Sequence, residues 1–211
     1  MTSREQILQQ VRSALRRSEG QTPPEPPPVR LHVPEMTLES RIASMTTRLE
    51  ALAGVVHRVK SPQAAGAWIA ETLAGRRAIA SNAAFLRDCG ITQIPGVRSG
   101  ITDREELRQL CATADVGISS ADYALADTGT LVLLSSLEAR MISLLPPIHF
   151  AILPATRLLT GLDELFTLVP NPSQLTRSVV LITGPSRTAD IEQILVRGVH
   201  GPGLLTAVLV G

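Results

Sequence analysis

Residues 55–80, with the sequence VVHRVKSPQAAGAWIAETLAGRRAIA, contain the pattern that decides the fold. The apolar run at 55–59 predicts a β-strand. Ser61-Pro62 is a typical helix start, because serine caps the first turn and proline is tolerated at its first position. The helix is expected to reach Leu73, and residues 77–80 then predict a short second strand. A strand, a helix and a strand in this order are typical of a parallel βαβ unit.

The same alternation continues along the chain. The apolar patterns predict helices at 37–53, at 82–89, after Thr102 through Ala112, at 162–168 and at 189–196. They predict strands at 116–120, 130–135, 141–145, 148–153, 179–183 and 206–210. Alternating strands and helices imply a mostly parallel sheet that is covered on both faces, so the expected fold class is α/β. The strands within 130–153 follow one another without a helix, which predicts an antiparallel insertion or edge in the same sheet.

The N-terminal segment has a different composition. Residues 3–17 carry apolar side chains at helical spacing, and Ser3 and Gln6 have the spacing of a capping box. Six prolines between residues 20 and 34 predict an extended linker. We therefore expect an N-terminal amphipathic helix in 1–19, a proline-rich linker in 20–36 and an α/β domain in 37–211. The apolar stripe of the helix needs cover from its own domain or from a partner subunit, and the sequence favours neither.

Charge and aromatic content argue against a nucleic-acid-binding protein. Twenty basic residues stand against nineteen acidic ones, a formal net charge of +1, and aromatic residues make up 2% of the chain. A broad basic face and a base-stacking platform are therefore both unsupported. Lys60 is the only lysine in the sequence and lies outside every polar cluster. Schiff-base chemistry and lysine-led phosphate transfer consequently have no candidate residue.

Cys89 and Cys111 are the only cysteines, and no Cys-x-x-Cys pair exists. Two thiols cannot hold an iron–sulfur cluster or a Cys-rich zinc site, and no His, Asp or Glu spacing suggests metal binding. We therefore expect no metal and no cofactor held by this chain's own residues. The sequence shows no secretory signal and no apolar run long enough to cross a bilayer, which predicts a cytoplasmic protein.

The first polar cluster interrupts the apolar segment 116–153. Asp127, Thr128, Gly129 and Thr130 are expected to form a tight turn. Its backbone N–H groups could form an anion-binding nest, or it could be a hairpin turn in which Asp and Thr satisfy its own backbone. Arg140 suits a bidentate grip on a carboxylate or phosphate. It also suits a structural ion pair with Glu138, Asp122 or Asp127.

The second and third polar clusters flank the last predicted helix. The second comprises Thr183, Gly184, Ser186, Arg187, Thr188 and Asp190. Because it follows a strand and opens a helix, it is typical of anion sites at the carboxyl edge of a doubly wound sheet, although the same residues suit simple N-capping. His200 lies in a loop that should reach that edge, either as an acid–base group or as a structural histidine. His149 is expected to be a satisfied core histidine. No P-loop, dinucleotide fingerprint or serine-hydrolase elbow is present.

Together these segments resemble the lactate utilization protein C family (LutC/YkgG), the group with the LUD domain. The resemblance covers roughly residues 37–211 and rests on ADYALADTGT at 121–130, Arg140 with SLLP at 143–146, TGPSRTADI at 183–191 and GVHGP at 198–202. It implies a fold similar to the Rossmann-like three-layer sandwich of the ribose-phosphate isomerase, glucosamine-phosphate deaminase and CoA-transferase group (NagB/RpiA/CoA transferase-like). It also implies a role in L-lactate degradation to pyruvate beside iron–sulfur oxidoreductase subunits. It identifies no catalytic residue.

Three functions are compatible with these features. The favoured one is a non-cluster subunit of a lactate-oxidising iron–sulfur assembly, which binds a small anionic ligand at the sheet edge through the three clusters. The alternative is a stand-alone transferase, isomerase or ligase acting on a phosphate or CoA ester, and it rests on fold analogy alone. The third is an assembly module that docks partners through the N-terminal helix. A homo-oligomer is compatible with each of them.

Overall fold

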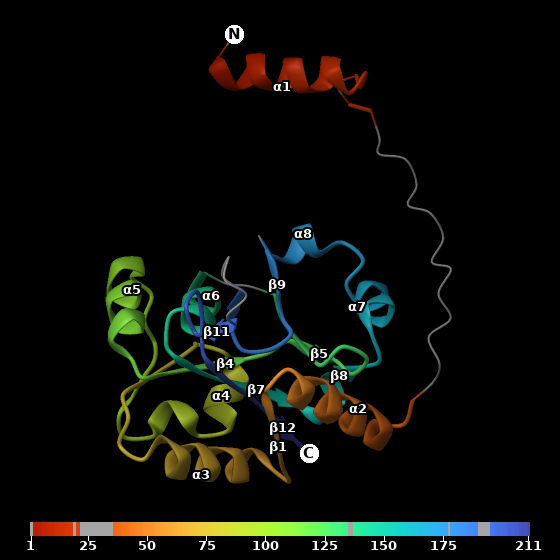
Figure 1. Ribbon diagram of the computed structural model, residues 1–211. Coiled ribbons are helices and arrows are strands. Elements are labelled where there is room, and N and C mark those ends of the chain that lie inside the picture. The colour runs from red at the N-terminus through yellow and green to blue at the C-terminus, as the bar shows by residue number, and fades with distance from the viewer. Residues whose placement is uncertain (1, 19, 22–35, 135–136, 177, 190–194) are drawn as a thin grey trace. The chain divides into compact units, whose positions relative to one another are not determined.

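The computed structural model describes residues 2–18, 20–21, 36–134, 137–176, 178–189 and 195–211. The chain divides into two units, Met1–Leu31 and His32–Gly211, each of which is considered by itself. The first contains helix α1 (Ser3–Ala14), which is shorter than the predicted 3–17 (Figure 1). Its N-cap is Thr2, which exchanges hydrogen bonds with Glu5, so the capping box lies one residue before the predicted pair. Most of the predicted proline-rich linker lies outside the described residues.

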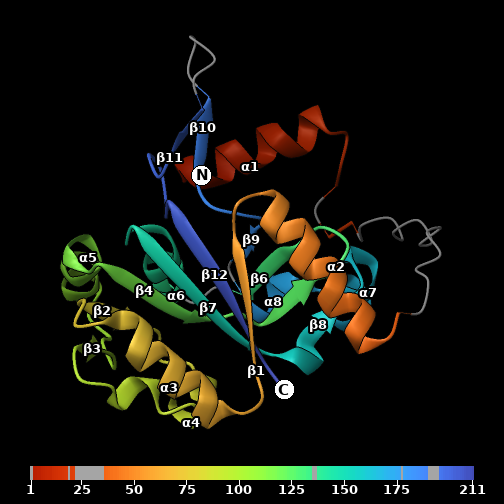
Figure 2. The ribbon, with the colours of Figure 1, turned by 60° about the horizontal axis from the view of Figure 1, so that its bottom comes forward.

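The second unit is built on a six-stranded sheet with the order β1-β12-β7-β4-β2-β3 (Figure 2). Its strands are β1 (Val55–Val59), β2 (Ala78–Ala80), β3 (Val97–Arg98), β4 (Val116–Ser120), β7 (Ile148–Pro154) and β12 (Leu204–Val210). Every neighbouring pair is parallel. The central strands are apolar on both sides, as strands of a parallel sheet must be. The predicted mostly parallel sheet is therefore confirmed.

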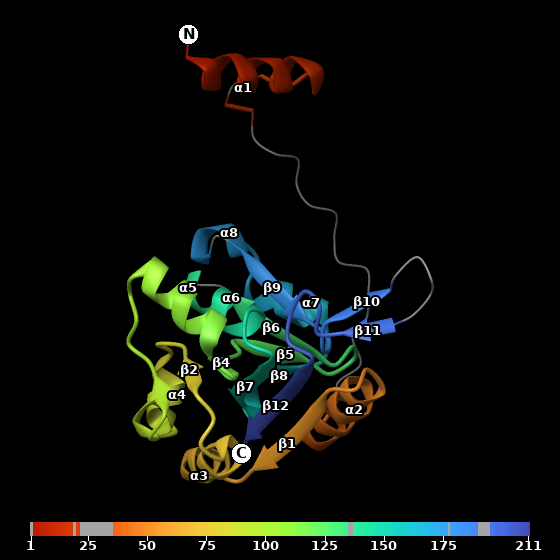
Figure 3. The same ribbon diagram turned by 60° about the vertical axis from the view of Figure 1, so that its left-hand side comes forward.

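Helices cover both faces of this sheet (Figure 3). On one face, α3 (Pro62–Leu73) and α4 (Ala84–Asp88) pack against side chains such as Ile118, Phe150 and Val208. On the other face lie α2 (Leu38–Ala51), α5 (Arg104–Thr113) and α6 (Leu137–Leu144). The bounds of α3 agree with the prediction, because Ser61 caps it and Pro62 occupies its first turn. The N-cap of α5 is Asp103, not Thr102.

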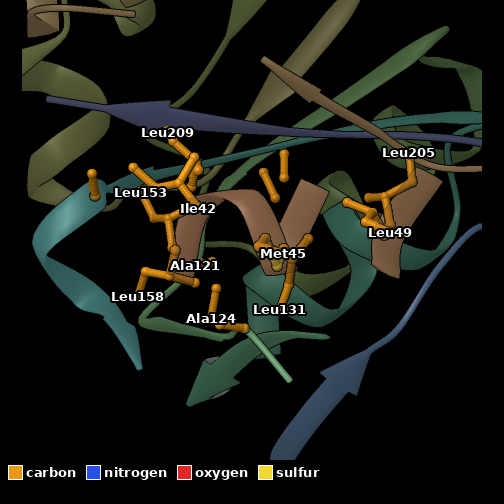
Figure 4. Packing of buried hydrophobic residues seen from close by; sticks show 14 of the residues in the cluster. Ile42, Met45, Leu49, Ala121, Ala124, Leu131, Leu153, Leu158, Leu205 and Leu209 are labelled. Atoms are coloured by element: carbon orange, nitrogen blue, oxygen red, sulfur yellow. The ribbon is translucent and has the colours of Figure 1, made fainter. Parts of the chain in front are cut away.

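The antiparallel strands form a separate sheet, which corrects the prediction that they extend the main one. The order is β8-β5-β6-β9, with β5 (Tyr123–Leu125), β6 (Thr130–Leu134), β8 (Leu158–Leu159) and β9 (Val179–Ile182). Strand β6 is antiparallel to β5 and β9, whereas β5 and β8 are parallel. Figure 4 shows Ile42, Met45 and Leu49 of α2 among residues of both sheets. Helix α7 (Leu162–Leu168) packs on this second sheet through Leu165.

Two predicted elements are wrong in type. Residues 141–145, expected as a strand, belong mostly to α6, because a short apolar run does not distinguish a strand from a buried helix. Ile142 is 1% exposed and Leu144 is 50% exposed, which is the one-sided burial of a helix. The predicted helix at 189–196 is replaced at both described ends by an antiparallel pair, β10 (Arg187–Ala189) and β11 (Leu195–Arg197). Its middle, residues 190–194, lies outside the described residues.

The remaining elements are short. They are the 3-10 turns Ile91–Gln93 and Ala155–Arg157 and helix α8 (Pro172–Leu175). Helix α4 begins at Ala84, later than the predicted residue 82, because the backbone N–H and side chain of Asn82 are bonded to Glu138 instead. Within the described parts of the chain, no helix has the length and apolar character needed to cross a membrane.

Candidate functional site

A cavity of about 360 Å³ lies at the amino ends of β7 and β12. Its walls come from α6, from β9 with the segment that follows it, and from the loop that leads into β12. His149 and Leu205, the paired second residues of β7 and β12, line it from the sheet. We call it the His149 cavity. The sequence placed a ligand site at the carboxyl edge of the sheet, but this cavity lies at the amino edge, because β9 belongs to the second sheet.

Five of the predicted site residues line the His149 cavity. They are Arg140, Thr183, Gly184, Ser186 and His200. The two loops that carry four of them are tied together, because the Ser186 N–H donates to the Pro202 carbonyl at 2.8 Å and the Gly198 N–H donates to the Ser186 carbonyl at 3.0 Å. The second and third clusters therefore converge, as predicted. The segment after Gly184 continues into β10 rather than into a helix, so no helix N-terminus contributes here.

The first cluster lies beside the cavity and touches it at one point. The hydroxyl groups of Thr130 and Thr183 form a hydrogen bond with an oxygen–oxygen distance of 3.0 Å. Other polar groups of the turn are already bonded: the Gly129 N–H donates to the Leu125 carbonyl at 3.0 Å, the Asp127 N–H donates to the Thr160 carbonyl at 3.0 Å, and the hydroxyl of Thr128 donates to Asp127 at 3.2 Å. Gly129 has φ +70° and packs on the backbone of α2, which leaves no room for a side chain. The hairpin alternative therefore describes these contacts better than an open nest.

The other predicted residues lie elsewhere. Arg187 and Thr188 belong to β10 and do not line the cavity, and Asp190 lies outside the described residues. Arg140 has no ion-pair partner in the described ranges, and Glu138, one of the partners considered for it, is bonded to Asn82. Its guanidinium is therefore available to a ligand.

His149 was predicted to be a satisfied core histidine, and its position at the cavity was not predicted from the sequence. Its ring is completely buried, with Nε2 2.8 Å from the hydroxyl oxygen of Ser119. Among the described residues, its Nδ1 has no hydrogen-bond partner. An unpaired buried polar atom is costly and rare in folded proteins. Burial lowers the pKa of His149 to about 4, so the ring is neutral at neutral pH. A neutral ring that is held by Ser119 through Nε2 keeps the capacity for one further hydrogen bond at Nδ1.

The residues that line the cavity are mostly apolar and include one arginine and no acidic residue. Its apolar walls include Leu144, Val180 and Leu181, and Arg140 and His200 are exposed beside them. Such a site suits a small molecule with an anionic end and an apolar body. One signal could have drawn attention to its centre. Ser119 and His149 are the polar interruptions of two strands predicted to be buried, and buried polar residues require partners.

The two thiols are structural in character. Cys89 and Cys111 are free and 3% and 1% exposed, and burial raises the pKa of each to about 11. We expect neither to react quickly with a disulfide thiol reagent in the native protein at neutral pH, and both to react after unfolding, because the thiolate is the nucleophile. A fast-reacting native thiol would contradict this, and Cys111→Ser would show which one it is. Metal-binding groups of three or more His, Cys, Asp or Glu are likewise absent from the described residues.

Comparisons with known proteins agree with this architecture. Residues 42–210 match the model of the LUD domain family. Lactate utilization protein C of Halalkalibacterium halodurans is 43% identical over 116 residues, which is 48% of this chain and 46% of that protein. The Bacillus subtilis protein of the same name is 39% identical over 111 residues, 50% of this chain and 46% of the relative. The aligned part thus spans about half the length of these curated relatives.

A solved structure shows the same fold. The crystal structure of a DUF162 family protein from Deinococcus radiodurans superposes with a TM-score of 0.64 at 17% sequence identity, covering 84% of this chain and 100% of that one. The family model covers most of the α/β unit, including both sheets and the residues of the His149 cavity. The chain therefore belongs to the LUD domain family.

Proposed function

We propose that this chain acts in lactate utilization, as a non-cluster subunit that works beside iron–sulfur proteins in the oxidation of L-lactate to pyruvate. The names of relatives that are 39–43% identical over about half of the chain support the pathway. Oxidation of lactate to pyruvate releases two electrons and two protons. Two buried thiols with raised pKa values offer no route for those electrons within this chain. In this proposal the partner proteins accept them.

The observation that carries the proposal is that, among the described residues, neither Nδ1 of His149 nor the guanidinium of Arg140 has a partner, and that both residues line one cavity. A 2-hydroxy acid complements both groups. Its carboxylate suits the Arg140 guanidinium, and its hydroxyl can hydrogen-bond to Nδ1. Its methyl group suits the apolar wall formed by residues such as Val180 and Leu205. The ligand would thus satisfy Nδ1 of His149, one of two buried side-chain nitrogens that have no partner among the described residues.

The two arginines predicted as anion grips provide the test, because only one lines the cavity. Arg140→Gln is expected to weaken L-lactate binding by about tenfold or more, since it removes a charge-assisted hydrogen bond. Arg187→Gln, on β10, is expected to bind as the unaltered protein does. Calorimetric titration with L-lactate measures both variants, and lactate oxidation with the iron–sulfur partners gives the functional readout. Equal affinities in the unaltered protein and Arg140→Gln would refute the assignment.

A thermal-shift comparison of ligands tests the alternative enzyme function. A ligand present at 100 times its Kd stabilises the fold by about 2.7 kcal/mol, which a thermal shift detects. Sugar phosphates, CoA esters and L-lactate are therefore compared with propionate, which lacks the hydroxyl. A shift with lactate that exceeds that with propionate supports our proposal. A shift confined to the phosphate or CoA compounds would instead favour a stand-alone transferase, isomerase or ligase.

A further inference from the structure

A second cavity, of about 350 Å³, lies at the opposite edge of the central sheet, where β2, β4 and β7 end. Strand β2 continues through α4 on one face of the sheet, whereas β4 continues through the second sheet and α6 on the other. Because β2 and β4 are neighbours, the chain leaves them in opposite directions and opens a crevice between their carboxyl ends. In open α/β sheets, ligands bind at such topological switch points. We call this the switch-point cavity.

Several polar side chains that line the switch-point cavity make few contacts within the described parts of the chain. Ser81 follows β2 and is 3% exposed, and Ser120 ends β4. Both serines line the cavity, and neither hydroxyl has a hydrogen-bond partner in the described ranges. Arg157 also lines it and forms no ion pair there. Its guanidinium carbon lies 5.9 Å from the ring centroid of Tyr123, and its Nη1 donates to the Asp122 carbonyl at 3.4 Å. The guanidinium is thus positioned at the cavity without a direct ion pair among the described residues, although its charge acts on the Asp122 carboxyl and works to lower the pKa of that group.

The cavity also has a rigid acceptor side. The Leu134 N–H donates to Oδ2 of Asp122 at 2.7 Å, and burial raises the pKa of this carboxyl. Glu138 accepts from the N–H and from Nδ2 of Asn82 at 2.8 and 2.6 Å. Oδ1 of Asn82 accepts from the Gly100 N–H at 2.7 Å. The Asn82–Glu138 bonds join the end of β2 to α6, and the Leu134–Asp122 bond joins the end of β6 to the segment after β4, so the acceptors are preorganised for a ligand that donates hydrogen bonds.

We propose that the switch-point cavity is a second ligand site, which binds a small hydroxy-carboxylic acid with its carboxylate on Arg157, Ser81 and Ser120 and its hydroxyls on Asp122. One arginine against two carboxylates makes a doubly charged phosphate less favourable than a ligand with a single carboxylate. Hydroxyl donors fit the acceptor side, whereas a purely apolar acid does not. This inference is independent of the proposed function, because the two cavities share no lining residue.

Glycerate is the probe, since it carries one carboxylate and two hydroxyls on a small frame. Two-dimensional NMR of the full chain follows the amide signals of Leu134 and Gly100, whose N–H groups are bonded to Asp122 and Asn82. Glycerate is expected to shift both signals in a saturable way. Propionate without hydroxyls, glycerol without a carboxylate, and inorganic phosphate are expected to bind more weakly. Equal binding of any of these three would overturn the proposed ligand class.

Variants assign the site. Arg157→Gln and Ser81→Ala are expected to weaken glycerate binding, the arginine variant by about tenfold or more. Arg98→Gln is the matched surface control, because Arg98 is exposed and lies by Glu106 on α5. Unaltered glycerate affinity in both Arg157→Gln and Ser81→Ala, or no saturable shift in the unaltered protein, would refute the second site without bearing on lactate binding at the first.

Discussion

Replacing Gly117 by alanine is expected to destabilise the folded chain by about 3 kcal/mol. Gly117 is buried in β4 beneath α6, and an added Cβ would overlap the carbonyl oxygen of Ile142 and come within 3.1 Å of Cγ of Pro146. Helix α6 cannot move away freely, because Ile142 packs against Ile79 and Leu107. Strand β4 is equally constrained, since it pairs with β2 and β7.

Urea unfolding measures this effect, with Gly203→Ala as the control. A Cβ at Gly203 would meet only ordinary contacts, the nearest at 3.5 Å, so we expect a loss below about 1 kcal/mol there. Because α6 carries Arg140 and Ser143, its displacement should also weaken lactate binding in Gly117→Ala. Similar unfolding midpoints for the two alanine variants would show that α6 is not packed on β4 as described.

Acidification between pH 6.5 and about 4 is expected to destabilise the protein through His149. The pKa of this ring is about 4 in the folded state, against its ordinary 6.5. Within that window the unfolded chain binds a proton that the folded chain does not, so stability falls as the pH falls. This difference in pKa corresponds to about 3 kcal/mol of unfolding free energy. The whole of that amount is lost once the pH falls below the folded-state pKa.

Denaturation at neutral pH and near the lower end of that window provides the measurement. His149→Gln removes the titrating ring, so its stability should depend less on pH than that of the unaltered protein. The comparison is needed because Asp122 acts in the opposite sense: burial raises its pKa, and its protonation at low pH favours the folded state. If the stability of the unaltered protein and of His149→Gln depended on pH in the same way, the His149 ring would have to be in contact with water or with a hydrogen-bond partner at Nδ1.

The main features of the α/β architecture could be predicted from local patterns. The strand at 55–59 and the helix beginning at Pro62 follow from apolar periodicity and from the Ser61-Pro62 start signal. Such signals depend on residues that are near one another in the chain. The same reasoning misplaced 141–145 and 189–196, where short apolar runs are compatible with more than one element. A hydrophobic run indicates that a segment is buried. The segments that pack against it in the tertiary structure decide whether it forms a strand or a helix.

The candidate sites were predicted less completely. Arg140, the loop at 183–186 and His200 were recognised as polar interruptions, and the structure brings them together. Arg187 had the same local character but lies on β10. The buried Nδ1 of His149 could not be predicted, because its missing partner is a property of the surrounding packing rather than of the strand.

By itself the sequence determined that this chain alternates strands and helices, that its basic residues are almost all arginines, and that its polar clusters resemble those of one family. Only the tertiary structure decided that β5, β6 and β9 leave the main sheet, and that two cavities open at its opposite edges. The physical reason is the range of the interactions. Periodicity and capping act within a few residues, whereas strand pairing and cavities join residues as distant as Ser81 and Arg157.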